Sequence, residues 1–294
     1  MAIRIGANPI GWTNDDMVEL GDDIPLEQCL SEAKAAGFEG MELGRKFPRK
    51  ADELGPILHS HGLALISGWY SSSLLVRDAR AEREALAPHL DLLKTLGAPV
   101  LILAETSNAT HGDRQAPISR RPVLETGAWP VFGRRLTELA EAVAGEGIAL
   151  VYHHHMGTAV QSGEDIDRLM EATGPAVHLL LDTGHALWGG ADPADLARRY
   201  CGRIVHFHAK DIRGDVRARV DAADMSFCDA VVEGVFTVPG DGMIDFAAVL
   251  RELGGYDGWL VVEAEQDPEK APPAQYARMG HDNLLHFARE AGLL

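Results

Sequence analysis

Residues 178–190, HLLLDTGHALWGG, hold the pattern that decides the fold, because an apolar run stops there at an acidic residue. The leucines of this run show no alternation of apolar and polar side chains, which is typical of a strand buried on both faces in a parallel sheet. Asp182 follows at once and His185 comes three positions later, with Gly184 between them where the backbone can turn sharply. The aspartate is therefore either the N-cap of a helix or a ligand directed into a cavity.

The same arrangement, an apolar run followed by an amphipathic stretch, recurs along the whole chain. The runs that we expect to be strands are 3–7, 38–43, 63–69, 100–104, 148–152, 177–181, 204–207 and 259–262. The expected helices are 25–36, 51–61, 79–96, 129–145, 164–172, 193–200, 246–253 and 276–291. Two further stretches, 106–127 and 212–242, are expected to be long loops, a kind that is often functional. This alternation over 294 residues predicts an α/β fold, a closed (β/α)8 TIM barrel forming one domain over 1–294, with an open doubly wound sheet as the alternative.

Composition narrows the choice of partner. The chain has 46% hydrophobic and 24% charged residues, as ordinary soluble proteins do. Its 27 basic and 44 acidic residues give a net charge of -17, which opposes binding to nucleic acid and to anionic membranes. The three cysteines lack metal or disulfide spacing, and we find neither a signal peptide nor a run of about 20 apolar residues. We therefore expect a cytoplasmic protein that binds a small molecule.

Acidic and imidazole side chains follow the predicted strands, at the end where TIM barrels carry their active sites. These residues and their polar neighbours are Glu42, Trp69, Glu105, His153, His154, His155, Asp182, His185, His206, His208, Lys210, Asp211, Glu263 and Glu265. Carboxylates combined with imidazoles from neighbouring strands are typical of a divalent metal site. Manganese, cobalt, magnesium and zinc all remain open, although the lack of a cysteine ligand disfavours structural zinc.

Several of these residues have a second interpretation. His206 is either a ligand or a hydrogen-bonded core histidine, and Glu42 and Glu105 either contact substrate or hold a ligand histidine in one tautomer. Trp12 and Trp69 either stack on a ring substrate or pack at the rim. Of the basic residues 45–50, Lys46 is the one that we expect to reach a substrate, while Glu265 is expected beside the site or exposed.

Six motifs carry a resemblance over nearly the whole chain. They are NPIGW (8–12), YHHHMGT (152–158), LLDTGHA (180–186), HFHAKD (206–211), FTVPGDG (236–242) and WLVVEAEQDP (259–268). With them the chain resembles the inosose dehydratase branch of the xylose isomerase-like barrel family, which also includes sugar epimerases and dehydroshikimate dehydratases. The resemblance implies a metal-dependent barrel that acts on a polyhydroxylated ketone.

Matched to the family's motifs, three metal ligands are implied: Asp182, His208 and Glu263. The family usually has a glutamate as fourth ligand at the end of strand five, where this chain has a histidine. The fourth ligand therefore stays open between His153, His155 and water, and we take His153. The resemblance favours Mn²⁺ or Co²⁺ as the ion and gives His185 a contact with substrate.

The implied reaction is loss of water from 2-keto-myo-inositol to give a trihydroxycyclohexane dione, in inositol catabolism. A hydro-lyase of this kind needs a base, for which we expect His155 or Glu263, and an acid or electrostatic partner, for which we expect His185 or Lys210. The expected substrate contacts are Trp12, Glu42, Lys46, Trp69 and Glu105. A sugar epimerase or isomerase of the same family is the alternative. The expected partner is a cyclitol ketone, not nucleic acid or a membrane, and a homo-oligomer is expected only on base rates.

Overall fold

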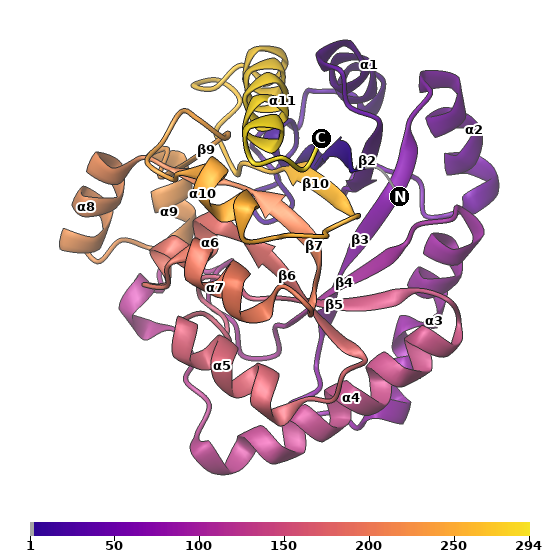
Figure 1. Ribbon diagram of the computed structural model, residues 1–294, viewed down its shortest axis with the longest axis vertical. Helices are drawn as coiled ribbons and strands as arrows, with labels where there is room; N and C mark the ends of the chain where they lie inside the picture. The colour runs from indigo at the N-terminus through magenta and orange to yellow at the C-terminus, as the bar shows by residue number, and fades with distance from the viewer. Residues whose placement is uncertain (1–2) are drawn as a thin grey trace.

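The computed structural model describes residues 3–294 and shows a closed parallel barrel. Within these residues eight strands follow one another around the barrel in the order β1-β10-β7-β6-β5-β4-β3-β2 (Figure 1). Their bounds are β1 Arg4–Ala7, β2 Gly40–Leu43, β3 Ala64–Ser72, β4 Val100–Glu105, β5 Ala149–His153, β6 Val177–Asp182, β7 Ile204–Ala209 and β10 Trp259–Val262. The predicted (β/α)8 barrel is confirmed, and the open sheet is excluded. Of the N-terminal stretch in which no signal peptide is expected, residues 1 and 2 lie outside the described part.

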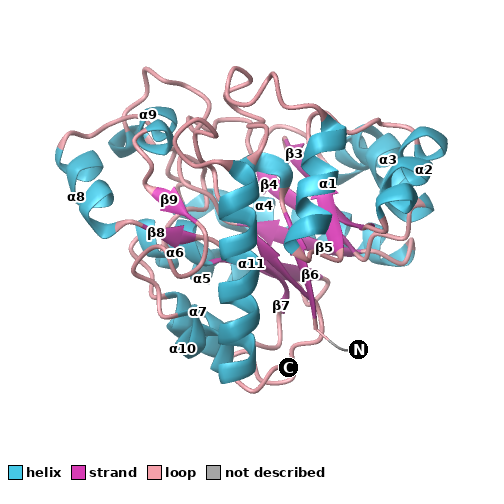
Figure 2. Ribbon diagram, turned by 90° about the horizontal axis from the view of Figure 1, so that it is seen from above, coloured by secondary structure: helices cyan, strands magenta, loops and turns pink. Residues whose placement is uncertain are grey.

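Helices surround the barrel, and at least one follows each barrel strand (Figure 1). Eight of them match the expected helices: α1 Leu26–Ala36, α2 Ala51–His61, α3 Ala79–Thr95, α4 Trp129–Gly145, α5 Gly163–Ala172, α7 Pro193–Tyr200, α10 Phe246–Arg251 and α11 Pro273–Glu290. Figure 2 shows the loops gathered at the end of the barrel away from the termini, where the strands end. No helix within 3–294 combines the length and the apolar character needed to cross a membrane.

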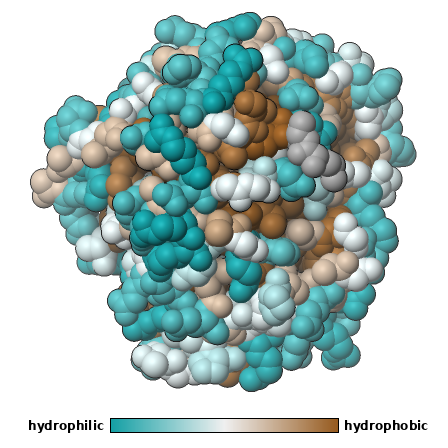
Figure 3. Space-filling model, in the orientation of Figure 1, coloured by the Kyte–Doolittle hydropathy of each residue, from teal (hydrophilic) through white to brown (hydrophobic). Residues whose placement is uncertain are grey.

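Strand β6, which contains the leucine run that precedes Asp182, is buried on both faces as predicted. Leu179, Leu180 and Leu181 are each 0% exposed. Leu180 packs with Val100, Ile102 and Val151, whereas its two neighbours belong to the larger core beneath the helices. Successive side chains of a strand point to opposite faces, so this run packs both the inside of the barrel and the helical layer. Figure 3 shows hydrophobic side chains also in the middle of the face viewed in Figure 1, ringed by hydrophilic ones.

The segment after β7 differs from the expected loop. It contains helices α8 Gly214–Ala222 and α9 Phe227–Val232, and a strand pair of β8 Asp211–Ile212 with β9 Phe236–Thr237. Asp211 orders this segment, since its carboxylate accepts backbone N–H groups of Ile212 at 2.8 Å and of Gly240, Gly242 and Ile244 at 3.0 Å. The sequence pattern missed α8 and α9 because they are short, at nine and six residues, and so show too little periodicity to be recognised.

A second long loop, 106–127, joins this segment rather than standing alone. It includes short 3-10 turns at Ile118–Arg120 and Thr126–Ala128. Ser119 donates to Asp224 from its backbone N at 3.0 Å and from its hydroxyl at 2.6 Å. Cys228 Sγ donates to His111 O at 3.1 Å. The loop and the α8–α9 segment therefore form one cap beside the mouth of the barrel.

Candidate metal centre and active-site cavity

Four side chains meet at the ends of four neighbouring strands, and we call them the donor cluster. They are His153 at the end of β5, Asp182 at the end of β6, His208 on β7 and Glu263 directly after β10. These strands are consecutive in the barrel, so one potential ligand atom of each side chain lies within 4.8 Å of the others. All four residues are buried. The structure thus brings together the four residues that we expected to be metal ligands.

The geometry of Asp182 is compatible with both roles that its sequence position allowed. Helix α6 (Thr183–Trp188) begins directly after β6, and Asp182 Oδ1 accepts the backbone N–H of His185 at 2.8 Å as its N-cap. Oδ2 faces the cluster, 3.7 Å from His153 Nε2 and 3.6 Å from His208 Nδ1. Because the two oxygens are used separately, the cap and the ligand interpretations are compatible.

Hydrogen bonds set which histidine nitrogens face the centre. His153 Nδ1 lies 2.6 Å from the carbonyl oxygen of His154, so it carries the proton of the neutral ring and Nε2 presents its lone pair. Burial, aided by the nearby charge of His208, holds the pKa of His153 well below its usual value. His208 Nε2 faces Glu42 at 3.1 Å, which leaves Nδ1 for the cluster. Partners of this kind orient histidine ligands in metal proteins.

The donor cluster fits a divalent ion. Among residues 3–294, Asp182 Oδ2, His208 Nδ1 and Glu263 Oε2 are buried atoms that make no hydrogen bond, although Nδ1 and Glu263 Oε2 form an ion pair with each other. Buried polar atoms normally have hydrogen-bond partners, so three potential ligand atoms that converge without hydrogen bonds suit a site for an ion. Two carboxylates and two imidazoles suit ions such as Mn²⁺, Co²⁺ or Zn²⁺.

Glu42 supports the cluster from the side. Its carboxylate accepts from Asn8 Nδ2 at 2.7 Å and from Ser67 Oγ at 2.6 Å, and His206 Nε2 lies 2.7 Å from Oε1. Burial raises the pKa of Glu42, but the charge of His208 and the hydrogen bonds from both histidines outweigh it and lower that pKa well below its usual value. Of the two expected interpretations, the contacts favour Glu42 as the group that orients His208, and His206 as a hydrogen-bonded core histidine.

Lys210 provides a buried positive charge against the cluster. Its Nζ lies 3.4 Å from Asp182 Oδ2, 3.0 Å from Glu263 Oε1 and 3.3 Å from Glu265 Oε2. Burial lowers the pKa of Lys210, but these carboxylates raise it more, so the net shift is upward. Gly184 makes this position available, because a Cβ there would lie 2.7 Å from Lys210 Cγ. The glycine is therefore needed for space, not for the sharp turn that we expected.

The remaining predicted acid–base groups divide into two sets. His155 lines the cavity in front of the cluster, and its Nε2 lies 3.4 Å from Glu265 Oε1. Burial lowers the pKa of His155, but its hydrogen bond to Glu265 and the charge of that carboxylate raise it above the usual value. His185 is fully buried behind the cavity, with Nε2 2.9 Å from Lys210 Nζ and its ring stacked near Phe227. The structure thus corrects the expectation that His185 lies over the substrate.

The donor cluster opens into a cavity with about 630 Å³ of space not filled by protein atoms, a volume that includes solvent at its open mouth. Its lining combines apolar and aromatic side chains with a few convergent polar groups, as small-molecule sites do. Among its lining residues, Trp69 brings its ring to 5.3 Å from that of His153 and 5.8 Å from that of His155. Glu42, His208, Glu263 and Glu265 also line it.

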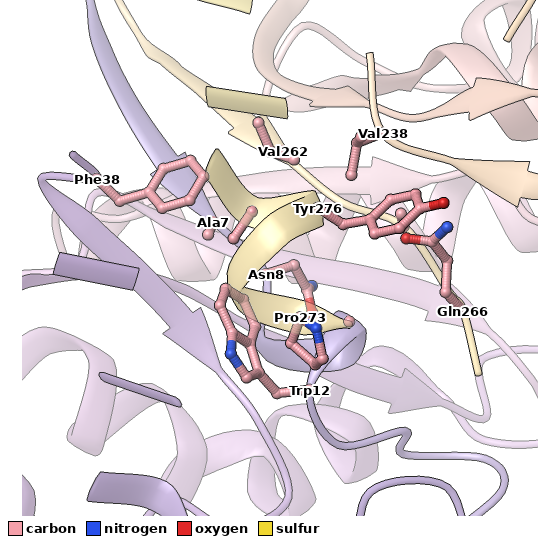
Figure 4. Close-up of a pocket in the computed structure, with 12 residues that line it drawn as sticks. Ala7, Asn8, Trp12, Phe38, Val238, Val262, Gln266, Pro273 and Tyr276 are labelled. Atoms are coloured by element: carbon pink, nitrogen blue, oxygen red, sulfur yellow. The ribbon is translucent and has the colours of Figure 1, made fainter. Parts of the chain in front are cut away.

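Three expected substrate contacts lie elsewhere, and these expectations need correction. Trp12 is 3% exposed, donates to Glu32 Oε2 at 2.8 Å and lines a separate, mainly apolar pocket with Phe38 and Tyr276 (Figure 4). Lys46 Nζ donates to the carbonyl oxygens of Gly21, Asp22 and Ile24 at 2.6–3.3 Å. The carboxylate of Glu105 accepts from Ser72 at 3.0 Å, Leu75 at 3.3 Å and Ser107 at 3.0 Å. Each of the two charged residues anchors a loop instead of reaching the cavity.

Sequence reasoning missed five polar lining residues: Asn8, Asp15, Asp16, Ser71 and His111. Asn8 follows β1 directly and Ser71 lies near the end of β3, so the rule that pointed to the other strand ends could have found both. Asp15, Asp16 and His111 lie inside long loops, where no periodicity indicates which side chain turns inward.

Comparison with known proteins agrees with this geometry. The chain is 53% identical over 294 residues to the rhizopine catabolism protein MocC of Rhizobium meliloti, covering 99% of this chain and 90% of the relative. It is 45% identical over 279 residues to an inosose dehydratase of Geobacillus thermodenitrificans (strain NG80-2), covering 94% of each. Both similarities agree with the resemblance carried by the sequence motifs.

Solved structures share the fold at lower identity. The IOLI protein, crystallised with a bound zinc atom, superposes with a TM-score of 0.65 at 17% identity, covering 98% of this chain and 97% of that one. The sequence model of the xylose isomerase-like TIM barrel family matches residues 30–285. With this match over most of its length, and with relatives of this identity, the chain belongs to the xylose isomerase-like TIM barrel family.

Proposed function

We propose that this protein removes water from 2-keto-myo-inositol and yields a trihydroxycyclohexane dione, as a step of inositol catabolism. Relatives named inosose dehydratase are 38–45% identical to it over most of its length, and the protein is a dehydratase. The observation that carries the specific proposal is the donor cluster, which opens into the same cavity as the His155–Glu265 pair. Loss of water from a keto-cyclitol needs a group that binds the ketone oxygen and the neighbouring hydroxyl, and a base that removes the proton from the carbon beside the ketone.

The proposed cofactor is a divalent ion, Mn²⁺ or Co²⁺, held by His153, Asp182, His208 and Glu263. Such an ion supplies Lewis acidity to the ketone oxygen and its neighbouring hydroxyl when bound. The proposal is supported by the donor atoms that make no hydrogen bond and by the mixed oxygen and nitrogen set.

His155 is the proposed proton-transfer group. Among the four predicted catalytic residues, His155 and Glu263 line the cavity, and Glu263 belongs to the donor cluster. The Nδ1–H of His155 points to Met156 O at 2.7 Å, so the neutral ring offers Nε2 to a proton beside the ketone. Glu265 stabilises the ring once it is protonated, and the same proton can then pass to the departing hydroxyl, which leaves as water.

Lys210 is the proposed charge partner in this elimination. Its position 3.0 Å from Glu263 and 2.9 Å from His185 holds a positive charge beside the place where the ketone gains negative charge. His185 and Phe236 fix that ammonium from behind, with Nζ 4.7 Å from the ring of Phe236. Trp69 is the proposed packing surface for the substrate ring.

The decisive experiment incubates the protein and Mn²⁺ or Co²⁺ with 2-keto-myo-inositol. We expect ultraviolet absorbance from a dione and a product lighter by one water in mass spectrometry, and no reaction with Asp182→Asn. A product of unchanged mass would instead indicate the epimerase or isomerase of the same family. The proposed cytoplasmic location fits three cysteines that are all unpaired. Assembly into a homo-oligomer stays a prediction.

A further inference from the structure

Two loops that flank the donor cluster meet above it. In the barrel, β1 is the neighbour of β10, and β4 is the neighbour of β5, so the loops after β1 and β4 start at the two ends of the arc that carries the donors. Asp16 lies in the first loop and His111 in the second, yet Asp16 Oδ1 is 3.7 Å from His111 Nε2. Both residues line the active-site cavity. The pair therefore closes over the donors from opposite sides.

The pair is close but not hydrogen-bonded. A separation of 3.7 Å is too long for an N–H···O bond. His111 Nδ1 is buried without a hydrogen-bond partner among residues 3–294. A buried N–H left unpaired costs more than a buried lone pair, so the ring proton belongs on Nε2, which faces Asp16. The two residues thus present a donor and an acceptor side by side with no bond between them.

An alcohol matches this arrangement. A hydroxyl group donates one hydrogen bond and accepts others, so one oxygen can donate to Asp16 while it accepts from His111. An oxygen at the usual distance of about 2.8 Å from each partner can be placed beside two atoms that are 3.7 Å apart. The pair's side chains are 28% exposed for Asp16 and 14% for His111, so each is accessible from the cavity without being free in solvent.

Asp16 is held in place before any ligand arrives. Asn14 Oδ1 accepts the backbone N–H groups of Asp16 at 2.8 Å and Met17 at 2.7 Å. Arg45 clamps the same loop by donating to Asn14 O and Val18 O, both at 2.8 Å. These bonds hold the backbone that carries the Asp16 carboxylate, so the loop itself loses little conformational freedom on binding, which favours discrimination between similar ligands.

The position of His111 is equally constrained. Its ring lies 5.0 Å from the ring of His155 and 6.4 Å from that of Phe227. Gly157, with a φ of +73°, lets the neighbouring loop come close, since a Cβ there would lie 2.8 Å from His111 N. The contact with His155 joins the pair to the proposed proton-transfer group.

We propose that Asp16 and His111 together bind one ring hydroxyl of the substrate, a hydroxyl other than those beside the ketone, and so determine which polyhydroxylated ketones the enzyme accepts. This inference rests on the proposed function, because it takes the substrate to be a keto-cyclitol held at the donor cluster. It assigns the specificity for distant hydroxyl groups to the two loops.

The test measures kcat/KM for 2-keto-myo-inositol and for a series of its analogues, each lacking one hydroxyl. The wild-type protein is compared with Asp16→Asn, Asp16→Ala and His111→Gln. Loss of a hydrogen bond to a charged group corresponds to about a 10- to 100-fold change. We expect both Asp16 variants to lose this much kcat/KM, relative to the wild type, on the parent ketone. On one analogue, the one that lacks the hydroxyl bound by the pair, the variants and the wild type should have the same kcat/KM.

The matched control is Asp23→Asn, an exposed aspartate of the same loop, which should keep the wild-type pattern. Metal content and thermal unfolding show whether each variant is folded. His111→Gln should lose activity on the parent ketone and should match the wild type on the same analogue as the Asp16 variants do. An equal loss on every analogue, or no loss on any, would overturn the inference. If the wild-type protein releases no water from the parent ketone, the proposed function fails instead.

Discussion

Replacing Asp182 separates the two roles that we assign to its carboxylate, helix cap and metal ligand. Asparagine keeps an oxygen for the N–H of His185 and is as good an N-cap as aspartate, but it places an amide where Oδ2 faces the donor cluster. Alanine removes both oxygens. The pair of variants therefore measures the cap and the metal ligand independently, on one residue.

The expected magnitudes follow from these contacts. The Coulomb attraction between Asp182 and Lys210 at 3.4 Å is about 5 kcal/mol at an effective dielectric constant of 20, but the cost of burying the carboxylate offsets most of it. Lys210 also keeps Glu263 at 3.0 Å and Glu265 at 3.3 Å. Without metal, we therefore expect the free energy of unfolding of Asp182→Asn to lie within about 2 kcal/mol of the wild-type value. Asp182→Ala should be about 1 kcal/mol less stable than Asp182→Asn.

Metal binding should respond far more strongly. Losing a residue that only orients a ligand weakens binding about 10- to 100-fold, so losing a ligand should weaken it more than about 100-fold, which is at least about 2.7 kcal/mol. Urea unfolding in chelator measures the stability, and calorimetric titration with Mn²⁺ measures the affinity. His185→Ala is the control, because it lies behind the cavity and should keep nearly normal metal content while turnover falls. Wild-type Mn²⁺ affinity in Asp182→Asn would refute the assignment of Oδ2, and equal stability of the two Asp182 variants would refute the cap.

Three further predictions concern the surroundings of the donor cluster. Glu42→Gln should weaken metal affinity about 10- to 100-fold with unchanged circular dichroism, because its carboxylate orients His208; unchanged titration curves would contradict this. Burial lowers the pKa of His111 from 6.5 to about 3, so the unfolded chain takes up a proton first as the pH falls below 6.5. In urea titrations from pH 6.5 to 4, the stability of the wild type should therefore drop by up to about 1.4 kcal/mol per pH unit more than that of His111→Gln. The control, His286→Gln, changes a side chain that is 72% exposed and should keep the wild-type slope. Mn²⁺ at 100 times its dissociation constant should stabilise the wild type by about 2.7 kcal/mol in thermal or urea unfolding, and chelator should abolish this gain. Asp182→Asn should not be stabilised at the same Mn²⁺ concentration.

The sequence predicted the barrel and three members of the donor cluster, Asp182, His208 and Glu263, and left the fourth open between His153, His155 and water. Strand burial follows from a local pattern, as in the leucines before Asp182, and the ends of parallel strands must meet at one edge of the barrel. Residues that follow strands directly, such as Asp182 and Glu263, could therefore be placed together before any coordinates were known. The same reasoning could have included Asn8.

Only the tertiary structure decided how each group is used. The use of Asp182 depends on where each oxygen points: Oδ1 accepts the N–H of His185, and Oδ2 faces the donor cluster. His185 lies behind the cavity because α6 begins without a loop after β6. Asp16 and His111 come together because two long loops are held by bonds to other loops, and such contacts leave no periodicity in the sequence. The stretch HLLLDTGHALWGG thus defines a strand and the acidic group at its end, while the loops around it supply the cavity residues to which we assign selectivity.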